Sequence, residues 1–72
     1  MKYEWQLIDG GTAHCEANGE EGTLELAKSA ADFAATQYEA EYSNDQMLHY
    51  RLDIYSDTEE WNRWRGGEWR KP

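Results

Sequence analysis

Two histidines and one cysteine are the residues of this chain with the most versatile chemistry. With the fifteen carboxylates, His14, Cys15 and His49 supply the ligand types of a zinc site and the nucleophile and base of a covalent enzyme. No short, regular spacing of the kind found in zinc sites links them. On an alternating strand, Cys15 also faces away from His14. We therefore expect no metal site, and we interpret Cys15 as a small core residue.

The other polar residues suggest no catalytic set. Carboxylate pairs are unavoidable among fifteen acidic residues, and a chain of 72 residues encloses little volume in which an acid or base could be desolvated. The glycine-containing segments 10–11, 19–22 and 66–67 lie where turns are needed, and none has the pattern of a phosphate-binding loop. The sequence predicts neither an enzyme nor a cofactor.

The start of the chain predicts a β-hairpin followed by a helix. Apolar and polar residues alternate over 3–17 around a turn at 9–11, and the polar segment 18–22 is expected to end the hairpin. Thr23 is the expected N-cap of an amphipathic helix over about 24–41.

Further strands are predicted after the helix. Alternation over 47–56 predicts a strand, 60–65 can form another, and 68–71 could add a short fifth one. The chain is therefore predicted to be a single α+β domain, residues 1–72, with the order ββαββ, in which one helix covers one face of a small antiparallel sheet.

The phases of these elements assign residues to the two sheet faces. The helix should bury a stripe of six residues: Leu26, Ala27, Ala30, Phe33, Ala34 and Tyr38. The strand after it should bury Leu48, Tyr50, Leu52 and Ile54. The open face of the sheet should carry His14, Glu16, His49, Arg51, Asp53 and Tyr55.

Charge gives the clearest indication of a partner. The net charge is -8, and Glu25, Asp32 and Glu39 recur every seven residues along the outer side of the predicted helix, with Glu20 and Glu21 just before it. Such a surface repels nucleic acid and anionic membranes and attracts basic proteins. We expect it to bind a basic protein surface; the alternative is that these charges only keep the protein soluble.

The last twelve residues differ from the rest of the chain, because they contain four of the seven cations and three of the four tryptophans. Arg63, Arg65, Arg70 and Trp69 form an alternative binding surface, since arginine and tryptophan stack on single-stranded bases and anchor protein interfaces. A further alternative is that these cations pair internally with carboxylates of residues 1–60. We expect Trp5 and either Trp61 or Trp64 in the core, and Trp69 exposed.

Three segments carry a resemblance in architecture: MKYEWQLIDGG as a strand, GTLELAKSAADFAA as the helix and WNRWRGGEW as a hairpin. In this arrangement the chain resembles small phage-encoded anti-defence proteins, especially anti-CRISPR proteins. Such proteins often occupy the nucleic-acid-binding or subunit-contact surfaces of host complexes, sometimes by mimicking the charge of DNA.

The resemblance implies a non-enzymatic inhibitor in the host cytoplasm that binds a basic subunit of a nucleic-acid-handling complex. Direct binding of nucleic acid is not expected from a protein of this charge, and no apolar run is long enough to span a membrane. The alternatives are a nucleic-acid-binding module that uses the tail, residues 61–72, or a small structural or adaptor domain.

Overall fold

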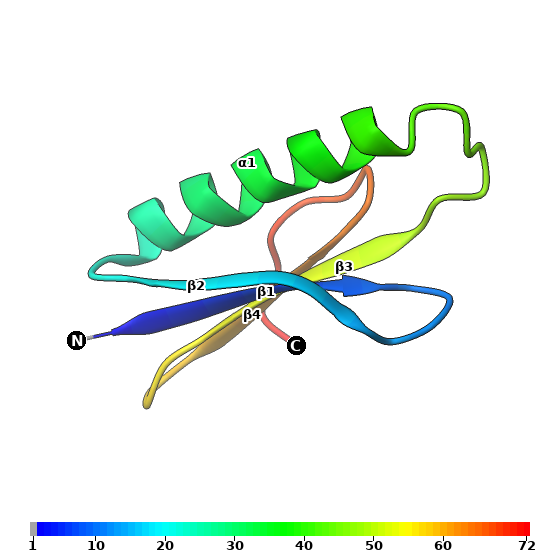
Figure 1. Ribbon diagram of the computed structural model, residues 1–72. Coiled ribbons are helices and arrows are strands. Elements are labelled where there is room, and N and C mark those ends of the chain that lie inside the picture. The colour runs from blue at the N-terminus through cyan, green and yellow to red at the C-terminus, as the bar shows by residue number, and fades with distance from the viewer. Residues whose placement is uncertain (1) are drawn as a thin grey trace.

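The computed structural model describes residues 2–72, which form a four-stranded antiparallel sheet with one helix against one face (Figure 1). The elements are β1 (Tyr3–Asp9), β2 (Cys15–Glu21), α1 (Leu24–Glu41), β3 (Tyr50–Tyr55) and β4 (Glu60–Trp64). The strand order is β2-β1-β3-β4. The predicted α+β class and ββαββ order are confirmed. Segment 68–71 adds no fifth strand, only a single bridge between Arg70 and Asn62.

Helix α1 has the bounds that the sequence predicts. Thr23 has an extended backbone, and its side-chain oxygen accepts a 3.1 Å hydrogen bond from the N–H of Leu26. This bond satisfies one of the donors that a helix leaves free in its first turn. The predicted N-cap is therefore confirmed. At the other end of the helix, the N–H of Tyr42 donates to the carbonyl of Tyr38 at 3.1 Å.

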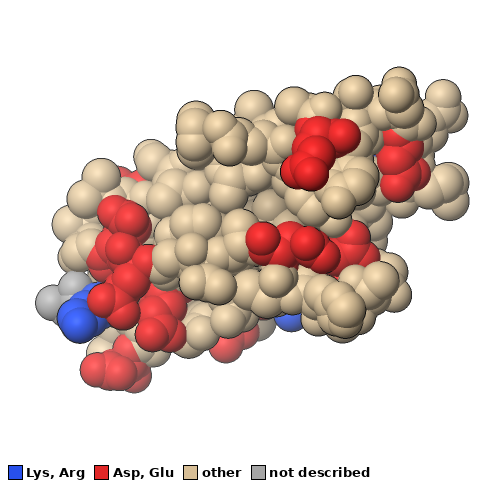
Figure 2. All heavy atoms as spheres, viewed as in Figure 1, with Lys and Arg blue, Asp and Glu red and all other residues tan. Residues whose placement is uncertain are grey.

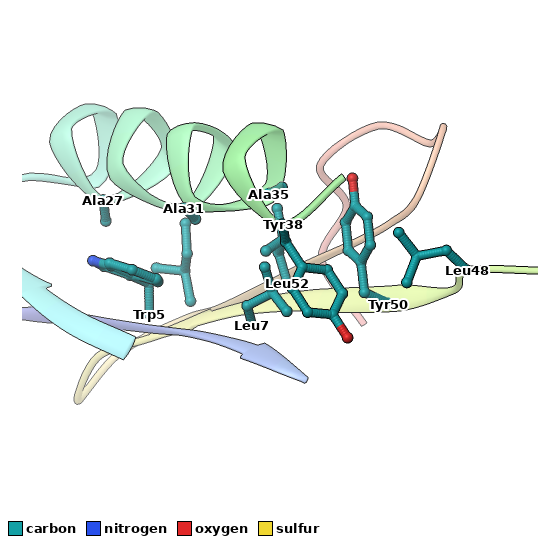
Figure 3. Packing of buried hydrophobic residues seen from close by; sticks show 10 residues of the cluster. Trp5, Leu7, Ala27, Ala31, Ala35, Tyr38, Leu48, Tyr50 and Leu52 are labelled. Carbon is teal, nitrogen blue, oxygen red and sulfur yellow. The ribbon is translucent and has the colours of Figure 1, made fainter. Parts of the chain in front are cut away.

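The core lies between the inner face of the sheet and α1 (Figure 3). The large side chains come mainly from the strands, as Trp5, Leu7, Tyr50, Leu52 and Ile54. The helix contributes Ala27, Ala31, Ala35 and Tyr38. Small helix residues let the helix approach the sheet closely, so the large strand residues fill the space between them. The predicted burial of Leu48, Tyr50, Leu52 and Ile54 is confirmed.

The predicted buried stripe of the helix is confirmed at Ala27 and Tyr38 and wrong at Leu26 and Phe33. Phe33 is 65% exposed and Leu26 is 54% exposed, whereas Ala31 and Ala35 are buried. The strand side chains already occupy the core, and a phenyl ring on the inner side would push the helix away from them. Leu26 and Phe33 therefore face solvent.

Strand β2 continues through the segment predicted to end it. Asn18, Gly19, Glu20 and Glu21 all pair with β1. A Cβ atom at Gly19 would lie 2.6 Å from Nε1 of Trp5, so this glycine makes room for the indole ring. The turn instead includes Ala13, which the alternation placed in the strand and which has a φ of 62°.

A β-bulge reverses the predicted alternation in β2. Leu7 pairs with Ala17, but Ile8 pairs with Cys15, which leaves Glu16 as the additional residue. Cys15 consequently lies with Ile8 on the outer face and is exposed, so its assignment to the core is wrong. Glu16 lies near Ala34 and other residues of α1 instead of on the open face.

Candidate functional site

Carboxylates from separate parts of the chain form a row across one end of the sheet. Glu4 lies opposite Glu20 on one side and Tyr55 on the other, and Tyr55 lies opposite Glu60. Paired residues point to the same face of a sheet, here the face away from α1. Like charges directly opposite one another destabilise a sheet, so the Glu4–Glu20 pair opposes folding.

More carboxylates surround this row. Glu21 lies opposite Tyr3, and Glu25 is in the first turn of α1. The pKa of Tyr3 is raised, first by burial and then by the negative charges of Glu59 and Glu25. Burial also raises the pKa of Tyr55, and Glu4 adds to this effect.

We call this group the acidic end and define it by six residues: Glu4, Glu20, Glu21, Glu25, Glu59 and Glu60. Figure 2 shows carboxylates gathered at the end of the molecule where the chain starts, on the left of the view. Within residues 2–72, Lys2 is the only cation in an ion pair with this group. Its Nζ lies 3.4 Å from Glu20 Oε1, and its side chain is 79% exposed. An ion pair so exposed is screened by water and neutralises little of the charge.

Two of the three carboxylates predicted on the outer side of the helix are neutralised internally. Arg63 Nη1 lies 2.9 Å from Asp32 Oδ1, and Arg65 Nε lies 3.0 Å from Glu39 Oε1. Asp32 and Glu39 therefore connect α1 to β4 and to the residue that follows it. Glu25 forms no ion pair with the described residues and belongs to the acidic end, as do Glu20 and Glu21.

The alternative surface of arginines and tryptophan in the tail is also divided. Arg63 and Arg65 are held by the helix carboxylates. Trp69 is partly buried against the core, so its predicted exposure is wrong; Trp64 is the exposed ring, at 46%. Trp69 is partly buried because of the bridge between Asn62 and Arg70. Since Arg70 points outward with Asn62, the preceding Trp69 points inward.

Three residues of the acidic end, Glu4, Glu59 and Glu60, were not predicted from the sequence. The sequence does contain features that could have indicated them: Glu4 alternates with buried residues of β1, and Glu59 and Glu60 follow a turn. Only the pairing of β1 with β3 and of β3 with β4 shows that these segments meet at one end of the sheet.

The chemistry available to the acidic end is that of anionic hydrogen-bond acceptors for lysine and arginine. No group of three or more His, Cys, Asp or Glu within residues 2–72 is placed to hold a metal ion. In the same part of the chain, α1 is not apolar enough to cross a membrane. Comparisons with known protein families, curated proteins and solved structures gave no match.

Proposed function

We propose that this protein is a non-catalytic binding protein whose acidic end docks on a basic surface of a nucleic-acid-handling protein and thereby inhibits it. The distribution of ion pairs carries this proposal. The internal arginines neutralise Asp32, Glu39 and Asp53, which lie outside the acidic end. The acidic end has only Lys2 as an internal counter-charge within residues 2–72. Its charge is therefore available to an external cation.

The choice of a nucleic-acid-handling partner follows from the geometry of the row. Neighbouring strands lie about 4.8 Å apart, so Glu20 and Glu4 present adjacent anions to a partner, and Glu60 adds a third anion two strands beyond Glu4. A protein that binds a phosphate backbone has lysines and arginines spaced for repeated anions. The architecture that resembles anti-defence proteins supports a host defence complex as the target.

The internal ion pairs of the arginines argue against the tail, residues 61–72, as the main binding element. Arg63 and Arg65 would each have to leave a carboxylate before binding a phosphate. A net charge of -8 also supplies little neutralisation for a long nucleic-acid strand.

Affinity capture with matched charge variants tests the proposal. The variant E4Q/E20Q/E60Q removes three carboxylates from the acidic end, and E16Q/E41Q/E68Q removes three from elsewhere. We expect the immobilised wild type and the second variant to capture the same protein from a bacterial lysate, and the first variant to lose it. Added duplex DNA should release the captured protein, because it competes for the same basic surface.

Two results would refute this function. One is equal capture by the two variants, because their net charges are the same and only the location differs. The other is a captured protein that DNA does not release and that does not itself bind DNA. The first variant should also melt no lower than the wild type, since it relieves the repulsion between Glu4 and Glu20.

A further inference from the structure

A hollow of about 320 Å³ lies beside β4. Its lining residues are Asn62, Trp64, Gly67, Glu68, Arg70 and Lys71. Trp64, which is the exposed tryptophan, lies opposite Arg51 on the outer face of the sheet. The hollow therefore has an aromatic wall and cationic residues at its border.

The backbone around the hollow is fixed by several bonds. The N–H of Gly67 donates to the carbonyl of Trp64 at 2.9 Å, and Arg63 Nε donates to the carbonyl of Gly67 at 3.1 Å. Gly66 between them has a φ of 77°, which favours glycine. Asn62 and Arg70 exchange two backbone hydrogen bonds of 2.8 Å. A ligand would not have to order this segment, which removes one cost of binding.

The indole of Trp64 is held in place by two neighbouring side chains. The ring of His49 stacks on it with a centroid distance of 4.9 Å and an interplanar angle of 16°. The guanidinium of Arg51 lies 5.7 Å from the ring centroid and is itself paired with Asp53 at 2.8 Å. A flat ring supported in this way is suited to stacking with another planar group.

Arg70 differs from every other lysine and arginine within residues 2–72. Lys2, Arg51, Arg63 and Arg65 form ion pairs, and Lys28 and Lys71 lie over the ring of Trp61. The Arg70 side chain forms none of these contacts with the described residues. The side-chain amide of Asn62 likewise has no hydrogen-bond partner among them. Both side chains point to the outer face, because their backbones are paired.

We propose that this hollow binds a nucleotide with a single phosphate group. The base stacks on Trp64, the phosphate accepts hydrogen bonds from the Arg70 guanidinium, and the Asn62 amide donates to or accepts from an edge of the base. The one carboxylate that lines the hollow, Glu68, disfavours ligands with several phosphates. The site is independent of the proposed docking function, because it shares no residue with the acidic end.

Nuclear magnetic resonance of the indole N–H groups tests this assignment with AMP as the probe. Each of the four tryptophans has one indole N–H, and Trp64→Phe identifies the signal of Trp64. We expect AMP to shift the signals of Trp64 and of the Asn62 amide in a saturable way. Adenosine alone and inorganic phosphate alone should bind more weakly, because each makes only part of the contacts.

Matched variants separate the site from the overall charge. Arg70→Gln should weaken AMP binding by roughly tenfold, the effect of losing a charge-assisted hydrogen bond. Lys2→Gln removes the same charge at the acidic end and should leave the affinity unchanged. Neither side chain belongs to the core, so both variants should fold.

A short deoxyadenosine oligonucleotide distinguishes a free nucleotide from a terminal nucleotide of a strand. Tighter binding of the oligonucleotide than of AMP would assign the hollow to the strand. Weaker binding would assign it to the free nucleotide, as the charge of the protein favours. The absence of a saturable AMP shift, or an equal loss of affinity in the Lys2→Gln and Arg70→Gln variants, would overturn the proposal. A saturable shift of the Trp64 signal with an acidic peptide, but not with AMP, would also overturn the proposal.

Discussion

The hydroxyl of Tyr38 donates a 2.6 Å hydrogen bond to Oδ2 of Asp9 and joins the last turns of α1 to the end of β1. The other oxygen of Asp9 accepts hydrogen bonds from the N–H groups of Gly11 and Thr12, at 2.8 and 2.9 Å. These bonds favour the charged carboxylate and lower the pKa of Asp9 from 3.8 to about 2, with Tyr38 as the largest cause. One carboxylate thus fixes both the hairpin turn and the position of the helix.

Acid should weaken this connection. The pKa of Asp9 is lower in the folded protein than in the unfolded chain. The contribution of Asp9 to stability is therefore complete above pH 3.8. It is lost as the pH falls towards 2. Tyr38→Phe should return the pKa of Asp9 towards 3.8, whereas Tyr42→Phe should leave it unchanged. An NMR titration of the Asp9 carboxyl checks both variants, and a wild-type value near 3.8 would contradict the role of the bond.

Phe33→Ala should leave the stability of the fold nearly unchanged, within about 0.5 kcal/mol, since an exposed ring loses little on truncation. Leu52→Ala, in the buried centre of β3, should cost about 2 to 5 kcal/mol. Thermal unfolding of the two variants measures the difference. A large loss for Phe33→Ala would mean that the helix buries the side that the sequence analysis predicted.

Gly19→Ala should destabilise the protein by about 1 to 3 kcal/mol, because the new Cβ would overlap the indole of Trp5. Gly22→Ala is the matched control, since a Cβ at that position meets nothing within 4 Å. Chemical denaturation should show a lower midpoint for the first variant only. If both variants behaved alike, the close approach of Trp5 to β2 would be refuted.

The ion pair of Arg63 with Asp32 should contribute roughly 0.2 to 1 kcal/mol of coupling energy, as measured for partly exposed pairs. A double-mutant cycle with Arg63→Gln and Asp32→Asn gives this energy directly. The same cycle on Lys2 and Glu20 should give less, because the Lys2 side chain is 79% exposed and that of Arg63 only 22%. A coupling energy of zero for the first pair would show that Asp32 is as available to a partner as Glu25.

The sequence predicted the parts of the fold in which local pattern and tertiary packing agree. Thr23 caps the start of the helix, and β3 alternates regularly between large buried residues and polar ones. The stretch from Asn18 to Glu21 has little intrinsic preference for a strand. It becomes one because β1 provides a partner and Trp5 fits over Gly19.

The phase of the helix could not be predicted because its buried side is alanine. Where alanines occur on several sides, the largest residues dominate the expected pattern, and they pointed to Phe33. The choice depends on how much volume the strands already fill, which is a property of the assembled core. Half of the acidic end, Glu20, Glu21 and Glu25, was predicted from its closeness in sequence. The other half, Glu4, Glu59 and Glu60, could not be, because only the strand pairing brings those segments together.

The strand order leaves two edges that differ in their exposure to other chains. The outer edge of β4 is partly occupied by the bridge to Arg70. The outer edge of β2 contains the bulge and three carboxylates, at Glu16, Glu20 and Glu21. Another strand that added there would have to approach these charges, a common protection against aggregation. Near neutral pH the sheet should therefore resist edge-to-edge growth, and it should lose this protection when acid neutralises its glutamates.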